Sequence, residues 1–286
     1  MISAKRFCYN YPILTACIVP ILYLLVVRQC IMSIAIRIFS SYTGRQYSSF
    51  VSLAVGEGVT ILVDLMVLML CGNIRILIQR GISRNKKVLY SSYIIFEILV
   101  LFAINVHQII YYKDSARSPL TILGCVIYLL LASISEEVMF RGFLVEILAS
   151  KYLNRRGGIW IVTIISSIAF ASIHLWNLFI PGASVGGILA QTVNAMLIGA
   201  YFTVIFLWTM SIWVSVILHF AYNFSQLLRS VCFVGKDVSE VISNYGTTFH
   251  SLFFLVHVFV FIIVICIMII MMRHQKHMPR KCSELE

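Results

Sequence analysis

Long runs of apolar residues dominate this chain and leave few folds open to it. Eight such runs are each long enough to cross a bilayer, and the short segments between them hold most of the charged side chains. Only 12% of the residues are charged, against about 25% in a typical soluble domain. The sequence therefore predicts an all-α fold, a polytopic membrane helical bundle of about eight transmembrane helices.

The fourth run is too long for one straight crossing, so we expect it to tilt or to continue into the membrane interface. The segment 28–49 carries three arginines among apolar residues, and we expect it to lie flat on the membrane. We place the spans approximately at residues 11–27, 50–71, 88–111, 119–150, 158–177, 186–206, 210–228 and 250–272.

The distribution of lysine and arginine predicts the topology. With the N-terminus inside, the inner segments hold fourteen of these residues and the outer segments seven. We therefore expect a multi-pass protein of the cell membrane with both termini in the cytoplasm and an uncleaved first span. The net charge of +11 comes mainly from these connections, which argues against nucleic acid as a partner and leaves membrane lipid as the expected one.

The stretch SISEEVMFRGF, residues 133–143, places charged side chains inside the fourth span. Each charge at this depth costs about 2.5–3.5 kcal/mol on insertion scales, so it needs a partner or a function. Glu137 and Arg141 are four residues apart on one helix face, in the order that favours an ion pair. Glu136 points about 100° away, so we expect it to be a spare carboxylate that can exchange protons as a general base.

Two later spans add polar residues at a similar depth. In FASIH, Phe170 and His174 are four residues apart, and in HFAYN the same spacing separates His219 from Asn223. An α-helix rises about 1.5 Å per residue, so depth in the membrane can be counted from the inner connections. By this count, the polar residues of both spans lie at about the same depth as Glu136. We therefore expect Glu136, His174, His219 and Asn223 to share one cavity.

This set of side chains suits amide hydrolysis. Glu136 would activate water, His174 would position the water or the scissile carbonyl, and His219 and Asn223 would face the developing oxyanion. Two histidines and a glutamate could instead hold Zn²⁺, although the HExxH signature is absent. A proton-coupled transporter is a further alternative, but the sequence shows no repeats or broken helices. Glu57 and Asp64 share a face of the second run, and we expect structural roles for them, in a polar seam or as partners of Arg141 or a connecting base.

The three motifs, in this order and on separate spans, resemble those of the CPBP family. This family comprises the CAAX protease and bacteriocin-processing (Abi) intramembrane proteases, including the type 2 CAAX prenyl proteases. EEVMFR is similar to its EExxxR motif, FASIH to FxxxH and HFAYN to HxxxN. The resemblance implies an intramembrane endopeptidase with catalytic Glu136, His174, His219 and Asn223. Glu137, Arg141 and Phe170 would support them.

The resemblance leaves cofactor and substrate open. Family members are commonly labelled metalloproteases, yet a glutamate-dependent mechanism without metal is also argued for the fold. We expect no required cofactor, with Zn²⁺ as the alternative, and a membrane-associated peptide or membrane protein as substrate. A non-catalytic bacteriocin self-immunity or scaffold protein of the same fold is the alternative function. We divide the chain into N-terminal transmembrane helices (1–112), a catalytic core (113–230), and a last helix with a cytoplasmic tail (231–286).

The topology predicts that Cys282 lies in the cytoplasm. It should therefore resist membrane-impermeant thiol reagents in intact cells and react once the cells are permeabilised. Labelling of Cys282 in intact cells would reverse the orientation derived from the charge count.

Overall fold

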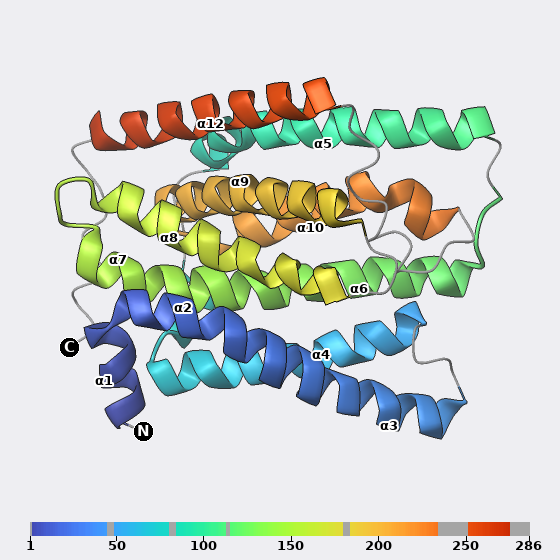
Figure 1. Ribbon diagram of the computed structural model, residues 1–286, viewed down its shortest axis with the longest axis horizontal. Helices are drawn as coiled ribbons and strands as arrows, with labels where there is room; N and C mark the ends of the chain where they lie inside the picture. The colour runs from blue at the N-terminus through green and yellow to red at the C-terminus, as the bar shows by residue number, and fades with distance from the viewer. Residues whose placement is uncertain are drawn as a thin grey trace.

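The computed structural model describes residues 2–44, 49–79, 84–112, 115–179, 184–233 and 251–274. Within these ranges the chain forms helices and no β-strand. Figure 1 shows consecutive long helices running in opposite directions, so that α2 begins and α12 ends at the same end of the molecule. Cys282 lies outside the described residues.

The helices follow the apolar runs closely. In chain order they are α1 (Ile2–Asn10), α2 (Pro12–Leu22), the π-helical η1 (Tyr23–Met32), α3 (Ser33–Thr43), α4 (Phe50–Cys71), the short 3-10 helix η2 (Ile74–Leu77), α5 (Arg84–Tyr112), α6 (Pro119–Glu137), the π-helical η3 (Val138–Val145), α7 (Glu146–Tyr152), α8 (Gly158–Ser172), the 3-10 helix η4 (Ile173–Phe179), α9 (Val185–Thr209), α10 (Ile212–Cys232) and α12 (Ser251–His274).

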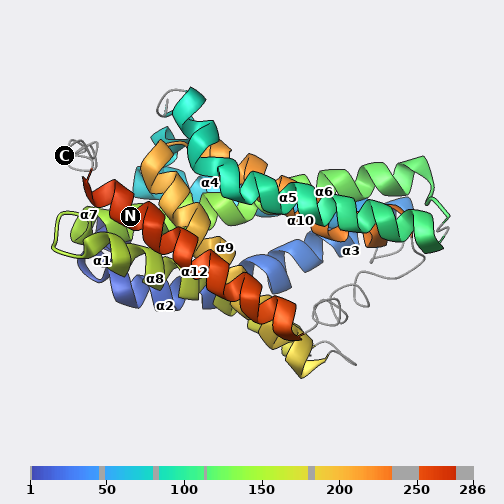
Figure 2. The same cartoon turned by 90° about the horizontal axis from the view of Figure 1, so that it is seen from above.

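The helical membrane bundle predicted from the sequence is confirmed. Six helices of the described residues are long and apolar enough to span a bilayer, and they correspond to the first six predicted spans. The seventh and eighth predicted spans are also helical, as α10 and α12. In Figure 2, α12 crosses α9, on which it packs. The cytoplasmic location of the termini stays a prediction.

The segment expected to lie flat on the membrane instead continues the first span. Residues Pro12–Thr43 form one unbroken helical segment of 32 residues, made of α2, η1 and α3. Its last part packs on α4, where the buried Ile36 lies against Gly56. The prediction was wrong because it assigned Arg28 to a connection, whereas the structure gives this arginine carboxylate partners inside the bundle.

The centre of the core is η3, in which all eight residues are buried. In the spans Pro119–Tyr152, Gly158–Phe179 and Val185–Thr209, more than half of the residues in the most apolar stretch are buried. In Ser91–Tyr112 the buried share is 11%. Large apolar side chains such as Phe96 on α5 and Phe259 on α12 are exposed. The interior of the bundle is therefore built around η3, while α5 and α12 present apolar surface to lipid.

Gly199 allows a close contact at the centre of this core. A Cβ atom at this position would lie 2.9 Å from Cδ1 of Phe170, which is too close for two carbon atoms. At Gly186, on the same helix, the nearest neighbouring atom would be 4.0 Å from the added Cβ. Of these two glycines, only Gly199 lies where a side chain would meet a neighbouring residue.

Gly199→Ala should therefore destabilise the protein by about 1–3 kcal/mol, because Phe170 must move within a packed core. Gly186→Ala is the matched control on α9 and should change stability by less than about 1 kcal/mol. Thermal unfolding of both variants in lipid nanodiscs measures the difference. Equal unfolding midpoints would contradict the close contact.

Candidate active site

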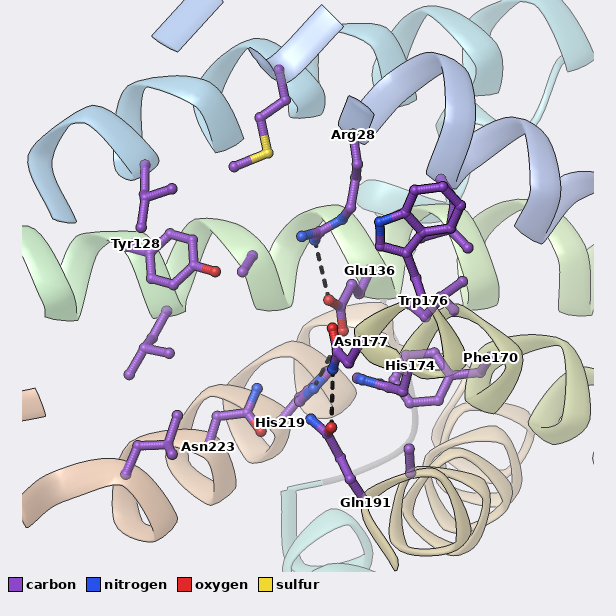
Figure 3. A pocket seen from close by; sticks show the side chains of 18 of the residues that line it. Arg28, Tyr128, Glu136, Phe170, His174, Trp176, Asn177, Gln191, His219 and Asn223 are labelled. Atoms are coloured by element: carbon purple, nitrogen blue, oxygen red, sulfur yellow. Dashed lines mark hydrogen bonds and ion pairs between the residues drawn. The ribbon is translucent and has the colours of Figure 1, made fainter. Parts of the chain in front are cut away.

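A cavity of about 460 Å³ lies between the helices and receives side chains from all three motifs. Glu136, His174, His219 and Asn223 all line it, from α6, η4 and α10 (Figure 3). The prediction that these four residues share one cavity is confirmed. The volume is in the range of about 300–1,000 Å³ that is usual for ligand sites. The catalytic roles of the four residues stay predictions.

Glu137 does not line the cavity, but its contacts connect the EEVMFR motif to the HFAYN motif. Its Oε1 accepts a hydrogen bond from Nη1 of Arg141 at 2.9 Å, as the spacing of four residues predicted. The same oxygen also bonds to Nδ1 of His219 at 2.8 Å. With Nδ1 held in this way, Nε2 of His219 lies 3.7 Å from Oε2 of Glu136. Glu137 therefore orients the histidine ring towards the neighbouring glutamate, a role that sequence spacing did not reveal.

Arg141 is 1% exposed and extends the same set of contacts to α9 and α8. It donates to the carbonyl oxygen of Gly199 at 3.1 Å, and its guanidinium lies 4.6 Å from the centre of the Phe170 ring. Phe170 makes edge-on contacts with the rings of His174 and His219, at 5.7 and 5.9 Å between centroids. Phe170 thus contacts the rings of both histidines, and the supporting role implied for it stays a prediction.

Glu136 is not the unpaired carboxylate that the sequence predicted. Its Oε1 accepts a hydrogen bond from Nη2 of Arg28 at 3.1 Å. Nη1 of the same arginine lies 3.0 Å from Oε1 of Glu57 on α4. The sequence does not reveal this contact, because Arg28 follows the predicted first span and its charge counts towards a connection. For Glu57, the spacing predicts Arg141 or a connecting base as partner.

A second set of buried hydrogen bonds lies beside this ion pair. The hydroxyl of Tyr23 on η1 is 2.8 Å from Oγ of Ser135, which in turn donates to Asp64 on α4. Ser135 directly precedes Glu136 in the chain. Asp64 therefore belongs to the polar seam that the sequence predicted for α4, and it helps to fix the end of α6.

Amide side chains form another wall of the cavity. Asn177 of η4 donates to Gln191 of α9 at 2.9 Å, and both side chains line the cavity (Figure 3). Asn194 also lines it and donates to the hydroxyl of Tyr222 at 3.2 Å. Gln191 and Asn194, three residues apart on α9, therefore both reach the cavity. Amides can bond to a peptide backbone, since they both donate and accept.

The residues do not form a zinc site of the expected kind. Within the described parts of the chain, no three His, Cys, Asp or Glu side chains are grouped as metal ligands. Nδ1 of His219 bonds to Glu137 and Oε1 of Glu136 bonds to Arg28, which leaves Nε2 of His219 and Oε2 of Glu136, 3.7 Å apart, as the atoms of these two residues that could bind a metal. That the protein requires no cofactor stays a prediction.

Part of the chain matches a known protein family. Residues 118–225 match the family model described as Type II CAAX prenyl endopeptidase Rce1-like. The predicted resemblance is confirmed. The matched segment includes all three motifs and supports a membrane protease of the CAAX endopeptidase type. No curated protein and no solved structure matches the chain.

The division into 1–112, 113–230 and 231–286 stays a prediction. The cavity takes residues from both sides of its first boundary, because Arg28 and Glu136 both line it. The N-terminal helices therefore contribute to the site as well as to the membrane anchor.

The two adjacent glutamates should differ in their effect on stability. Glu137→Gln removes the buried charge that pairs with Arg141, and breaking such a pair costs about 3–5 kcal/mol. Glu136→Gln should cost much less, because it leaves Arg28 paired with Glu57. Unfolding of the two variants in the same lipid nanodiscs gives the comparison. Equal stabilities would show that Glu137 is not the principal partner of Arg141.

Proposed function

We propose that this protein is an intramembrane endopeptidase that hydrolyses a peptide bond in a membrane-associated peptide or protein. The observation that carries the proposal is the shared cavity, into which Glu136, His174, His219 and Asn223 reach from three helical elements. Polar groups at membrane depth are costly unless they are used, and this cavity can hold both a peptide segment and water.

In this proposal Glu136 is the general base. Its Oε2 takes a proton from water, the water oxygen attacks the scissile carbonyl carbon, and a tetrahedral oxyanion forms. When the C–N bond breaks, Glu136 returns the proton to the leaving amine nitrogen. Glu136 lines the cavity with 12% of its side chain exposed, so water can reach this carboxylate.

The remaining polar groups position the water and stabilise the oxyanion. His174 and His219 are both held by Phe170, which fixes their rings relative to Glu136. His219 donates from Nε2 when its ring is protonated, while Glu137 binds the opposite nitrogen. The amide of Asn223 supplies a neutral donor. Donors fixed in advance at the site of developing charge contribute about 3–4 kcal/mol each in other hydrolases.

The substrate class follows from the matched family and is part of the proposal. The family name makes a peptide with a prenylated C-terminal cysteine motif the first substrate to test. Bacteriocin leader peptides and other membrane proteins are the further classes that the resemblance implies. A substrate of any of these classes would reach the cavity from the membrane.

Glu136→Gln should lower cleavage by at least about 100-fold while the protein remains folded, because no other cavity residue would replace the base. The assay uses purified protein in nanodiscs and an internally quenched peptide that carries a farnesylated cysteine followed by three residues. Glu146→Gln is the control, since Glu146 lies on α7 and does not line the cavity. Cleavage by Glu136→Gln at the wild-type rate would refute the proposal.

The same assay tests the metal-free version of the mechanism. Prolonged treatment with 1,10-phenanthroline should leave cleavage within about twofold of the untreated rate, because each step is assigned to side chains of the chain itself. Loss of activity with the chelator, followed by recovery on addition of Zn²⁺, would assign the water activation to a metal.

A further inference from the structure

Arg28 is a cation inside the bundle that comes from outside the segment matched to the protease family. It lies on η1, whereas the family match begins at residue 118. Its side chain is 19% exposed and lines the cavity beside Glu136. Figure 3 shows Arg28 and His219 reaching Glu136 from different helices. The cost of placing an arginine at this depth requires a function or a structural need.

The two carboxylates that bind Arg28 are in different surroundings. Glu57 is fully buried and does not line the cavity, so it has no access to substrate. Glu136 is partly exposed and lines the cavity. Arg28 presents Nη1 to Glu57 and Nη2 to Glu136. One nitrogen of the guanidinium is therefore anchored on a buried carboxylate, and the other binds the proposed base.

Further contacts fix Arg28 and the end of α6 together. Nη2 of Arg28 lies 3.4 Å from the hydroxyl of Tyr23, and the guanidinium lies 5.3 Å from the centre of the Tyr23 ring. The same hydroxyl bonds to Ser135, the residue before Glu136. η1 therefore holds two consecutive residues of α6, one through Tyr23 and one through Arg28.

We propose that Arg28 is a positioning residue for Glu136, and this inference rests on the proposed function. By binding Oε1, it fixes the rotation of the carboxylate so that Oε2 is directed towards Nε2 of His219. A general base must lie within hydrogen-bond reach of the water that it deprotonates. Free rotation of the carboxylate would reduce the fraction of time that Oε2 spends in this position. Arg28 acts through Glu136 and does not itself touch the reacting atoms.

The opposing explanation is that Arg28 serves only to neutralise Glu57. The two roles separate in a double variant, because Arg28→Gln/Glu57→Gln removes the arginine without leaving Glu57 as an unpaired buried charge. If Arg28 positions Glu136, the double variant should regain the stability lost in Arg28→Gln but not its activity. Glu57→Gln alone keeps the contact of Arg28 with Glu136 and an amide oxygen that can accept from Nη1, so its kcat should fall less than that of Arg28→Gln.

The experiment measures kcat and KM for the farnesylated peptide in nanodiscs, together with thermal unfolding. We expect Arg28→Gln to lower kcat by about 10- to 100-fold with KM changed by less than about threefold, and the double variant to show the same kcat. Arg28→Lys keeps the charge but cannot bind both carboxylates as the fork does, so it should recover kcat only in part.

Return of kcat in the double variant to within threefold of the wild type would overturn the inference, and so would an Arg28→Gln variant as active as the wild type. If Arg28→Gln and the double variant both fail to fold, the Arg28→Lys variant tests the inference. A kcat within threefold of the wild type would overturn it, and a tenfold loss of kcat at unchanged KM would support it. Glu136→Gln is measured in parallel. If it cleaves as well as the wild type, or if the wild type cleaves nothing, the proposed function fails and this inference fails with it.

Discussion

The ion pair between Glu137 and Arg141 is the contact on which the arrangement of the site depends. Both side chains are fully buried, and each would be very costly in this environment without the other. Further hydrogen bonds connect the pair to other helices, since Oε1 of Glu137 also bonds to His219 on α10 and Nη2 of Arg141 donates to the carbonyl of Gly199 on α9. Satisfying one buried pair therefore fixes the relative positions of three helices, and with them the ring of His219.

The aromatic packing around this pair carries the same constraint to the cavity. Phe170 lies against the guanidinium of Arg141 and also contacts both histidine rings. Gly199 leaves the space that Phe170 occupies. A polar site inside a membrane protein needs such support, because water cannot compensate for a misplaced polar group at this depth. The supporting residues are thus as much a condition of the proposed chemistry as the residues that face the cavity.

The sequence predicted those parts of the site that obey regular helical spacing. Glu137 and Arg141 are four residues apart, and the ordered motifs on three spans placed Glu136, His174, His219 and Asn223 in one cavity. Arg28 could not be found in this way. Arg28 is five positions after Tyr23. In an α-helix this spacing places the two side chains about 140° apart around the axis, whereas in the π-helical η1 they are in contact. The bonds of Glu137 to His219 and of Glu136 to Arg28 also depend on how the helices pack, which spacing within one span does not determine.

The first span, Pro12–Thr43, contributes to the site although it lies outside the segment that matches the protease family. The segment 118–225 contains all the motif residues, yet within the described residues the ion-pair partner that holds Oε1 of Glu136 comes from η1, and that partner is anchored by Glu57 on α4. Charges linked by ion pairs inside lipid must be balanced as a group, because removing one leaves its partners without solvation. The carboxylates of Glu57 and Glu136 share one guanidinium, so the electrostatics of the cavity are determined jointly by helices on both sides of the boundary at residue 112. A chain reduced to the matched segment would therefore contain the motifs but not the charge that holds Glu136 in position.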